Sequence, residues 1–229
     1  MTKFIYLWTF LGECPKMTKR KSKPTEEYDE PSETELYQRM MFMPEPHRSY
    51  AALMYLFGNR VSEGIPGRSR FISRNTGELN QREYPGIRKK DIQEQEGWIE
   101  ISQMPTLKRK VKDATKFYRE GILFIYGPGE MPFVKILQDY INSKEDYEIL
   151  WKKTRKSIWY NCNKYLKIPP KKLRGMRAKK DAKKYGLGAL ELKEKYNWGD
   201  TDMPFHYAKF NKDSLKNKME RIAQYSRIS

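Results

Sequence analysis

The chain has 229 residues, with 46 Lys and Arg against 29 Asp and Glu, which gives a formal net charge of +17. This basic excess, on a chain with 38% hydrophobic residues, favours a folded protein with a polyanionic partner, nucleic acid ahead of a membrane surface. The alternative interpretation of this charge is a basic protein of ribosomal type or a soluble basic protein without a specific partner. Two distant cysteines and two histidines argue against a disulfide framework and a histidine zinc site, and they suit a reducing, cytoplasmic compartment.

Residues 1–32 are predicted to form a flexible N-terminal arm. Within and just after it, residues 17–34 are charged, contain proline and are poor in apolar side chains, which is typical of linkers. The apolar stretch 4–12 is too short to span a bilayer. No small-residue cleavage site follows it, so we expect neither a membrane segment nor a signal peptide.

Two helices are predicted next. Residues 33–42 have helical composition, and residues 49–63 contain a strongly apolar helix with side chains available for burial. That helix is predicted to end near Gly58. Arg60 and Glu63 would then lie at its polar exit.

The middle of the chain predicts one small antiparallel sheet. Residues 64–85 are basic and rich in glycine, and they are predicted to form an irregular excursion. Residues 97–102 alternate like a strand, and residues 121–127 do so too but are apolar on both faces, which predicts burial. The Lys-rich segment between them is predicted to form the tip and flanks of a long hairpin.

The C-terminal half is predicted to be helical. The helical patterns cover residues 131–141, 148–166, 173–186, 189–197, 203–210 and 214–225. The last pattern has a thin apolar stripe of Leu215, Met219 and Ile222, too narrow for a core element. The fold class expected from these patterns is mainly α with a small antiparallel β-sheet (α+β).

Four short motifs follow one another in a fixed order. They are "GNRVSE" (58–63), "PGIRKKDI" (85–92), "KKLRGMRA" (171–178) and "NWGDTDMPFHY" (197–207). Arg174 and Tyr207 are 33 positions apart, and Trp198 precedes Tyr207 by nine. In this order and at these intervals, the chain resembles the tyrosine recombinase (lambda-type integrase) family over roughly residues 33–212. Lys171 in the usual histidine position resembles the integrases of archaeal spindle-shaped viruses.

The resemblance implies a catalytic set of Arg60, Lys108, Lys171, Arg174, Trp198 and Tyr207. Tyr207 would be the nucleophile, and the two arginines would hold the non-bridging oxygens of a DNA phosphate in bidentate fashion. Trp198 would donate its indole N–H to the same phosphate. Lys171 would assist proton movement at Tyr207, and Lys108, with Lys110 as second choice, would protonate the leaving 5′ oxygen.

The family also implies a function and partners. The chain would be a site-specific recombinase that cleaves and rejoins double-stranded DNA at attachment sites. It would need no cofactor, because cationic side chains replace a metal ion and the phosphotyrosyl bond conserves the energy that ATP would supply. Residues 33–212 would form the catalytic domain, and the helix 213–229 would dock in trans in a homotetramer on DNA. A viral or mobile-element origin would place the protein at the host nucleoid.

Each motif residue also has an ordinary explanation. Arg60 alone would be a cation at a helix C-terminus, and Trp198 alone would be a core residue. Lys171 and Arg174 would be a solvated phosphate patch. His206 is predicted to be a bystander or a groove contact, because adjacent helical residues point about 100° apart. Joint spacing, rather than any single residue, favours the enzyme.

The N-terminal region departs from the family pattern. About 32 residues precede the first predicted catalytic-domain helix, too few for the separate core-binding domain that family members carry. We therefore expect either a fragment or a chain that clamps DNA differently, with residues 64–85 as a candidate substitute. Two rival functions stay open: a catalytically idle DNA-binding protein with the same fold, and a type IB topoisomerase-like relaxase.

Overall fold

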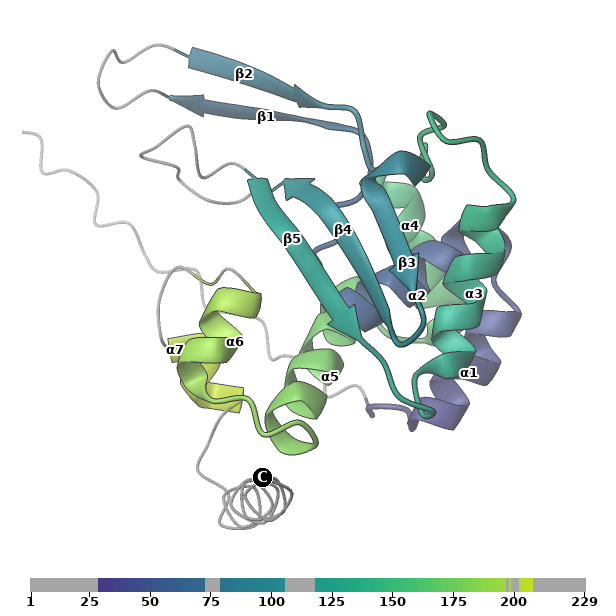
Figure 1. The fold of residues 1–229 in the computed structure, drawn as a ribbon, viewed down its shortest axis with the longest axis vertical. Coiled ribbons are helices and arrows are strands. Elements are labelled where there is room, and N and C mark those ends of the chain that lie inside the picture. The colour runs from purple at the N-terminus through teal and green to yellow at the C-terminus, as the bar shows by residue number, and fades with distance from the viewer. Residues whose placement is uncertain (1–28, 73–78, 106–117, 197, 199–201, 208–229) are drawn as a thin grey trace, which may run out of the picture.

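The structure, a computed structural model, describes residues 29–72, 79–105, 118–196, 198 and 202–207 (Figure 1). The helices of these residues are α1 (Glu33–Met41), α2 (His47–Phe57), the 3-10 turn η1 (Lys89–Asp91), α3 (Met131–Asn142), α4 (Arg155–Asn161), the π-helical turn η3 (Cys162–Leu166), α5 (Pro170–Lys183), α6 (Ala189–Lys195) and α7 (Asp202–Tyr207). The strands are β1 (Gly67–Ile72), β2 (Leu79–Tyr84), β3 (Ile92–Gln95), β4 (Trp98–Pro105) and β5 (Tyr118–Ile125). Lys108, Lys110 and the helix predicted over 213–229 lie outside the described residues, so their assignments stay predictions.

Helix α2 forms the buried centre of the fold. Every side chain from Ala51 to Phe57 is at most 2% exposed, as expected for a helix that is apolar on most of its circumference. α2 packs against α3 and α5 and also contacts β5. It ends at Gly58, whose φ of 60° is a left-handed conformation that glycine adopts without steric cost. The predicted end of this helix is confirmed.

The larger sheet has the antiparallel strand order β3-β4-β5. Ile99 lies opposite Phe124 in its register, and both side chains are buried against the helices. The strands predicted over residues 97–102 and 121–127 are confirmed, and so is their antiparallel pairing. The expected burial of the second strand on both faces is wrong at Ile125, which is 68% exposed.

Residues 64–85, predicted to be irregular, contain the two-stranded sheet β1–β2. Its register pairs Arg68 with Glu83, and their side chains form an ion pair at 2.8 Å. Both strands lack the apolar alternation that marks a half-buried strand, which is why the sequence pattern missed them. The described residues therefore contain two small antiparallel sheets, and the α+β class is confirmed. In Figure 1 the β1–β2 hairpin extends beyond the larger sheet.

The helix predicted over residues 148–166 begins later than expected. The Leu150 N–H donates to Ile87 O at 2.9 Å, and Trp151 is fully buried. α4 starts only after Thr154, whose hydroxyl accepts a hydrogen bond from a backbone N–H of the first turn. Tertiary contacts of the preceding segment thus outweighed its helical pattern.

Apolar side chains gather in two clusters that α5 connects. The larger cluster occupies the space between the three-stranded sheet and helices α1 to α4. The smaller one consists of Ala178, Ala182, Leu192, Tyr196 and Trp198. In Figure 1, α6 and α7 accordingly form a lobe on one side of α5, with α1 and α3 on the other. No helix in the described part of the chain is both long and apolar enough to cross a bilayer.

Candidate active site

The segment that follows α2 holds an arginine on a buried carboxylate. The backbone N–H and Nη1 of Arg60 both donate to the Glu63 carboxylate, at 2.6 and 2.7 Å. Glu63 is fully buried, whereas 27% of the Arg60 side chain is exposed. Glu63 therefore fixes the guanidinium while leaving part of it open to an incoming group.

Arg174 reaches the same carboxylate from α5. Its Nη1 lies 3.7 Å from Glu63 Oε2, so one buried carboxylate stands between two guanidiniums. Nη1 also donates to Gly58 O at 3.0 Å, and Nη2 donates to Tyr196 O at 2.8 Å. A planar guanidinium with fixed acceptors on two sides is held in one orientation. The fold thus preorganises Arg174, which is only 8% exposed.

Three aromatic rings continue the site beyond Arg174. The Tyr196 ring stacks on Trp198 with centroids 4.9 Å apart, and Trp198 stacks on Tyr207 with centroids 5.6 Å apart. A Cβ placed on Gly175 would lie 3.4 Å from Tyr207 Oη. The Tyr207 hydroxyl therefore lies beside α5, at the residue that directly follows Arg174.

The electrostatic surroundings of Tyr207 act in opposite directions. Burial is the largest effect and raises the pKa of its hydroxyl, whereas the positive charges of Lys179 and Arg174 lower that pKa and Glu30 raises it. The net result is a pKa above the usual value, so the phenol is protonated at neutral pH. Lys179 Nζ pairs with Glu30 Oε1 at 2.6 Å, so the two charges that act on the Tyr207 hydroxyl in opposite directions belong to one ion pair.

Lys171 lies one turn before Arg174 and is exposed. The first turn of α5 contains no acidic residue, although helix N-termini favour negative charge. Lys171 and Lys172 therefore add positive charge to a helix end that already attracts anions. No hydrogen bond or ion pair among the described residues joins Lys171 to Arg174 or Glu63, and the proton-handling role of Lys171 stays a prediction.

Trp198 and His206 show contacts that bear on their ordinary explanations. Trp198 is 7% exposed and belongs to the smaller apolar cluster, so it is a core residue as well as the ring on which Tyr207 stacks. His206 is exposed, and its ring meets the Tyr207 ring edge-on at 5.2 Å. This contact leaves its predicted bystander role untested.

Contacts connect four of the six predicted residues: Arg60 and Arg174 share the Glu63 carboxylate, Arg174 lies against the Trp198 ring, and Trp198 stacks on Tyr207. Sequence reasoning missed Tyr196, Lys179 and Glu30. Of these, only Lys179 left a sequence signal, because it follows Gly175 by four positions and so shares its helix face. Two neighbouring guanidiniums can hold the non-bridging oxygens of a phosphate, and a phenol close to one of them can act as a nucleophile, as phosphoryl transfer requires. The described residues contain no group of three or more His, Cys, Asp or Glu side chains placed to hold a metal ion.

Solved structures share this fold at low sequence identity. The XerH site-specific recombinase bound to its difH substrate, in a pre-cleavage complex, matches with a TM-score of 0.51 and 12% identity over 82% of this chain and 51% of that chain. XerH in a post-cleavage complex with palindromic difH matches with a TM-score of 0.50 and 12% identity over 82% and 50%. This chain thus spans about half the length of these structures. No protein-family model matches it, and no curated protein matches it by sequence.

Proposed function

We propose that this chain is a site-specific DNA recombinase, or integrase, that cleaves and rejoins DNA through a 3′-phosphotyrosyl intermediate on Tyr207. The observation that carries the proposal is a continuous line of contacts. Arg60 and Arg174 share the Glu63 carboxylate, the Arg174 guanidinium lies 5.5 Å from the centre of the Trp198 ring, and Trp198 stacks on Tyr207. Fold alone does not define an activity. These residues meet on the fold of XerH, a recombinase that was crystallised with its DNA substrate, and that agreement supports the proposal.

In the proposed reaction, Tyr207 Oη attacks the scissile phosphorus and the bond to the 5′ oxygen breaks. Extra negative charge develops on the non-bridging oxygens, where the guanidiniums of Arg60 and Arg174 stabilise it, and Trp198 adds its indole N–H. Each such preorganised donor is worth about 3–4 kcal/mol in comparable oxyanion sites. Glu63 contributes by holding both guanidiniums on one side of the phosphate.

Two lysines complete the proton transfers of the proposal. Lys171 assists removal of the phenolic proton, and Lys108, with Lys110 as the alternative, protonates the 5′ oxygen as it leaves. Strands β4 and β5 flank the segment that contains Lys108, so the general acid would come from the hairpin connection. Rejoining is the reverse: the 5′ hydroxyl attacks phosphorus, the phosphotyrosyl bond breaks, and the phenolate regains its proton.

Three finer assignments belong to this proposal. The partner is double-stranded DNA at attachment sites, bound by a homotetramer that the segment 213–229 holds together. Lysine in the usual histidine position places the chain nearest to the integrases of archaeal spindle-shaped viruses. The hairpin β1–β2 takes part of the clamp function, since it extends beyond the larger sheet and carries Arg68 on its first strand (Figure 1).

A covalent-capture experiment tests the proposal. The protein is incubated, in EDTA and without ATP, with a pool of duplexes that carry one nick each between randomised flanks. Cleavage just upstream of a nick releases a short fragment that diffuses away, so rejoining fails and the 3′-phosphotyrosyl adduct accumulates. Denaturing gels detect the adduct, and sequencing of the captured DNA gives the preferred site.

The same experiment separates the rival functions. A folded protein that binds DNA but forms no adduct with any duplex in the pool is a catalytically idle DNA-binding protein. An adduct together with relaxation of a supercoiled plasmid, and no joining of strands from two duplexes, identifies a type IB topoisomerase-like relaxase. An adduct together with strand joining between duplexes that carry the captured site identifies the recombinase.

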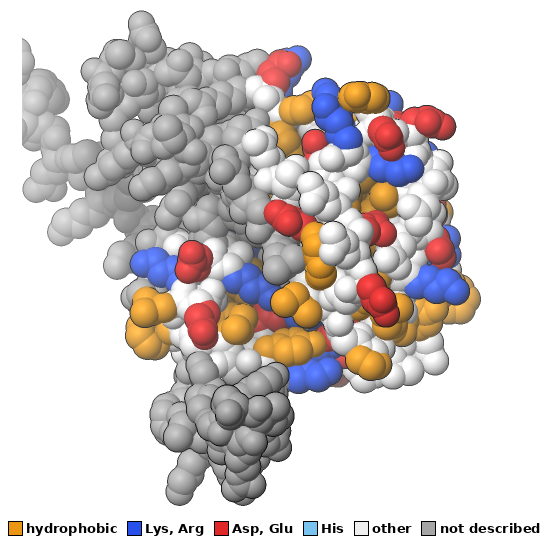
Figure 2. All heavy atoms as spheres, in the orientation of Figure 1, with side chains coloured by type: hydrophobic (Ala, Val, Ile, Leu, Met, Phe, Trp, Pro, Cys, Tyr) orange, Lys and Arg blue, Asp and Glu red, His pale blue; other side chains and the backbone are white. Residues whose placement is uncertain are grey.

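We expect DNA affinity to depend steeply on salt. On the coloured part of the face in Figure 2, basic and acidic side chains are interspersed, and the full chain carries a net charge of +17. If the chain neutralises roughly 6 to 8 phosphates, the logarithm of affinity falls against the logarithm of salt concentration with a slope of about −5 to −7. Fluorescence anisotropy of a labelled duplex measures this slope. A slope shallower than about −2 would contradict phosphate-dominated binding.

We also expect Lys179 and Glu30 to shift the pH dependence of cleavage in opposite directions. Cleavage needs the Tyr207 phenolate, so its rate rises with pH up to the pKa of that hydroxyl. Lys179→Gln removes a charge that lowers this pKa, so the rising limb moves to higher pH. Glu30→Gln removes a charge that raises the pKa, so the limb moves to lower pH.

Single-turnover rates of adduct formation across a pH series measure both shifts. Lys183→Gln is the matched control, because it removes an exposed lysine from the same helix and should leave the profile unchanged. Shifts of the same sign for Lys179→Gln and Glu30→Gln would show that their charges do not act on the Tyr207 hydroxyl.

A further inference from the structure

Tyr196 is buried and cannot touch a substrate, yet it contacts two residues of the candidate site, Arg174 and Trp198. Its carbonyl oxygen accepts from Arg174 Nη2 at 2.8 Å, and its ring lies 5.1 Å from the same guanidinium. The Trp198 ring stacks on the Tyr196 ring, with centroids 4.9 Å apart and planes inclined by 24°. Tyr196 is 0% exposed. One side chain and its carbonyl therefore set the position of two site residues at once.

The Tyr196 ring also explains why Gly58 must be glycine. A Cβ on Gly58 would lie 2.2 Å from Tyr196 Cε1, far inside van der Waals contact, and its φ of 60° is strained for other residues. Gly58 O in turn accepts from Arg174 Nη1 at 3.0 Å. The end of α2, the Tyr196 ring and the Arg174 guanidinium thus form one packed unit.

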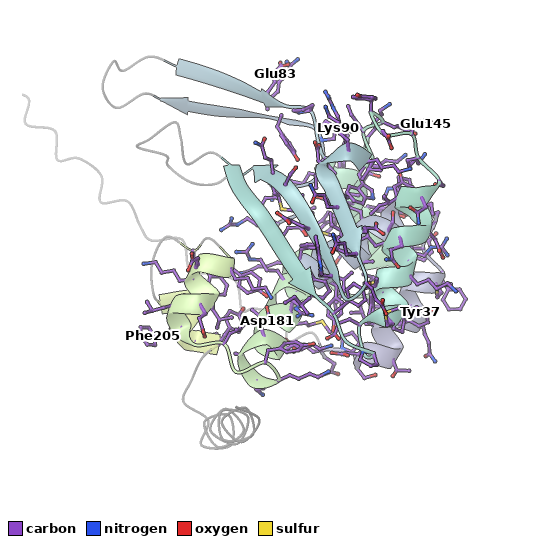
Figure 3. All side chains as sticks on the ribbon, in the orientation of Figure 1. Tyr37, Glu83, Lys90, Glu145, Asp181 and Phe205 are labelled. Carbon is purple, nitrogen blue, oxygen red and sulfur yellow. The ribbon has the colours of Figure 1, made fainter. Side chains whose placement is uncertain are left out.

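A buried carboxylate holds the far end of Tyr196. The hydroxyl donates to Asp181 Oδ2 at 2.5 Å, and Asp181 is 0% exposed. Lys195 Nζ lies 2.8 Å from the same oxygen, and Arg177 Nη2 forms an ion pair with Oδ1 at 2.7 Å. Asp181 thus lies between two cations, and its carboxylate accepts a short hydrogen bond from the Tyr196 hydroxyl. In Figure 3, Asp181 lies between α5 and the α6–α7 lobe.

We propose that Tyr196, anchored through its hydroxyl to Asp181, is the positioning residue that aims Arg174 and Trp198 at the scissile phosphate. The inference rests on the proposed function. Because a small misplacement of a transition-state donor costs far more in rate than in ground-state affinity, loss of the anchor lowers the rate of cleavage and leaves DNA affinity unchanged. A purely structural tyrosine would instead lower stability alone.

Tyr185, which lies just after α5, provides a matched control. Its hydroxyl donates to the buried carboxylate of Glu130, which also pairs with Lys180 at 2.6 Å. Tyr185→Phe therefore removes a comparable bond from a tyrosine to a buried carboxylate. Tyr185 has none of the contacts with Arg174 and Trp198 that Tyr196 has among the described residues.

The experiment compares Tyr196→Phe and Tyr185→Phe in the covalent-capture assay. Tyr196→Phe should slow single-turnover adduct formation about tenfold, with the Kd for the uncleaved duplex unchanged. Tyr185→Phe should form the adduct at the wild-type rate, although both variants lower the melting temperature. In an Arg174→Ala background, Tyr196→Phe should slow the reaction no further, because its effect passes through Arg174.

Two results would overturn the inference. One is a wild-type cleavage rate for Tyr196→Phe, and the other is an equal slowing with and without Arg174, which would make the two effects independent. Should Tyr196→Phe fail to fold, Asp181→Asn takes its place in the same two backgrounds, since asparagine keeps an acceptor oxygen but loses the charge. Adduct formation by the wild-type protein is measured before any variant is compared. If the wild type forms no adduct, the proposed function itself is contradicted.

Discussion

Tyr207→Phe is expected to abolish the covalent adduct with nicked DNA while leaving affinity for the same duplex within about twofold. Phenylalanine keeps the ring that stacks on Trp198 with centroids 5.6 Å apart, so the lobe of α6 and α7 keeps its packing. Only the hydroxyl beside Gly175 is lost. Because that oxygen is the proposed nucleophile, nothing in the site can replace it.

Gel shift and covalent capture, run on one preparation, measure the two quantities. Tyr147→Phe is the control, since it removes a hydroxyl from a side chain that is 75% exposed and distant in sequence. Peptide mapping of the wild-type adduct should place the DNA on Tyr207. An adduct that persists in Tyr207→Phe would assign the nucleophile to another residue.

Arg174→Ala is expected to slow adduct formation by a factor of about one hundred or more. The guanidinium is held by two carbonyl oxygens and lies close to the Glu63 carboxylate, so it needs no reorganisation when charge develops on the phosphate. Loss of one such donor costs about 3 kcal/mol of transition-state stabilisation, which corresponds to about two orders of magnitude in rate.

The same substitution also affects stability, and the two effects must be separated. Removing Arg174 leaves Gly58 O and Tyr196 O without this buried donor, which costs about 1–3 kcal/mol of folding free energy. Urea unfolding measures that cost in folding free energy. Cleavage rates of the variant and the wild type are then compared under conditions in which both proteins are folded. The cleavage rate of Arg174→Lys should lie between those of the wild type and Arg174→Ala, because lysine keeps the charge but loses the planar fork of donors. A cleavage rate for Arg174→Ala within about threefold of wild type would assign the phosphate to other groups.

Much of the helical framework could be predicted because its signals are local. Gly58 marked the end of the apolar helix α2, and helical composition predicted the helix that carries Arg174 over residues 173–186, although α5 begins three residues earlier, at Pro170. Arg60 and Glu63 come shortly after Gly58 in the sequence, so their place at the end of α2 could be predicted as well. The positions of these residues relative to one another could be expected only from the order and spacing of the motifs.

The elements that could not be predicted depend on long-range contacts. The β1–β2 hairpin is held by backbone pairing between polar strands, which no side-chain periodicity reports. The segment before α4 is extended because Trp151 is buried and Leu150 pairs with Ile87. Tyr196 acts on Arg174 through its carbonyl oxygen, a group that every residue has, so no motif could identify it.

The order of the site along the chain has a consequence for its assembly during synthesis. Chains emerge from the ribosome N-terminus first, and their parts fold as they become available. Glu63 and Arg60 are made together, and Arg174 joins them more than one hundred residues later. Tyr196, whose carbonyl oxygen is the second acceptor of the Arg174 guanidinium, is made later still, and Tyr207 follows it. Under the proposed function, the residues that hold the phosphate are therefore all synthesised before Tyr207, the proposed nucleophile.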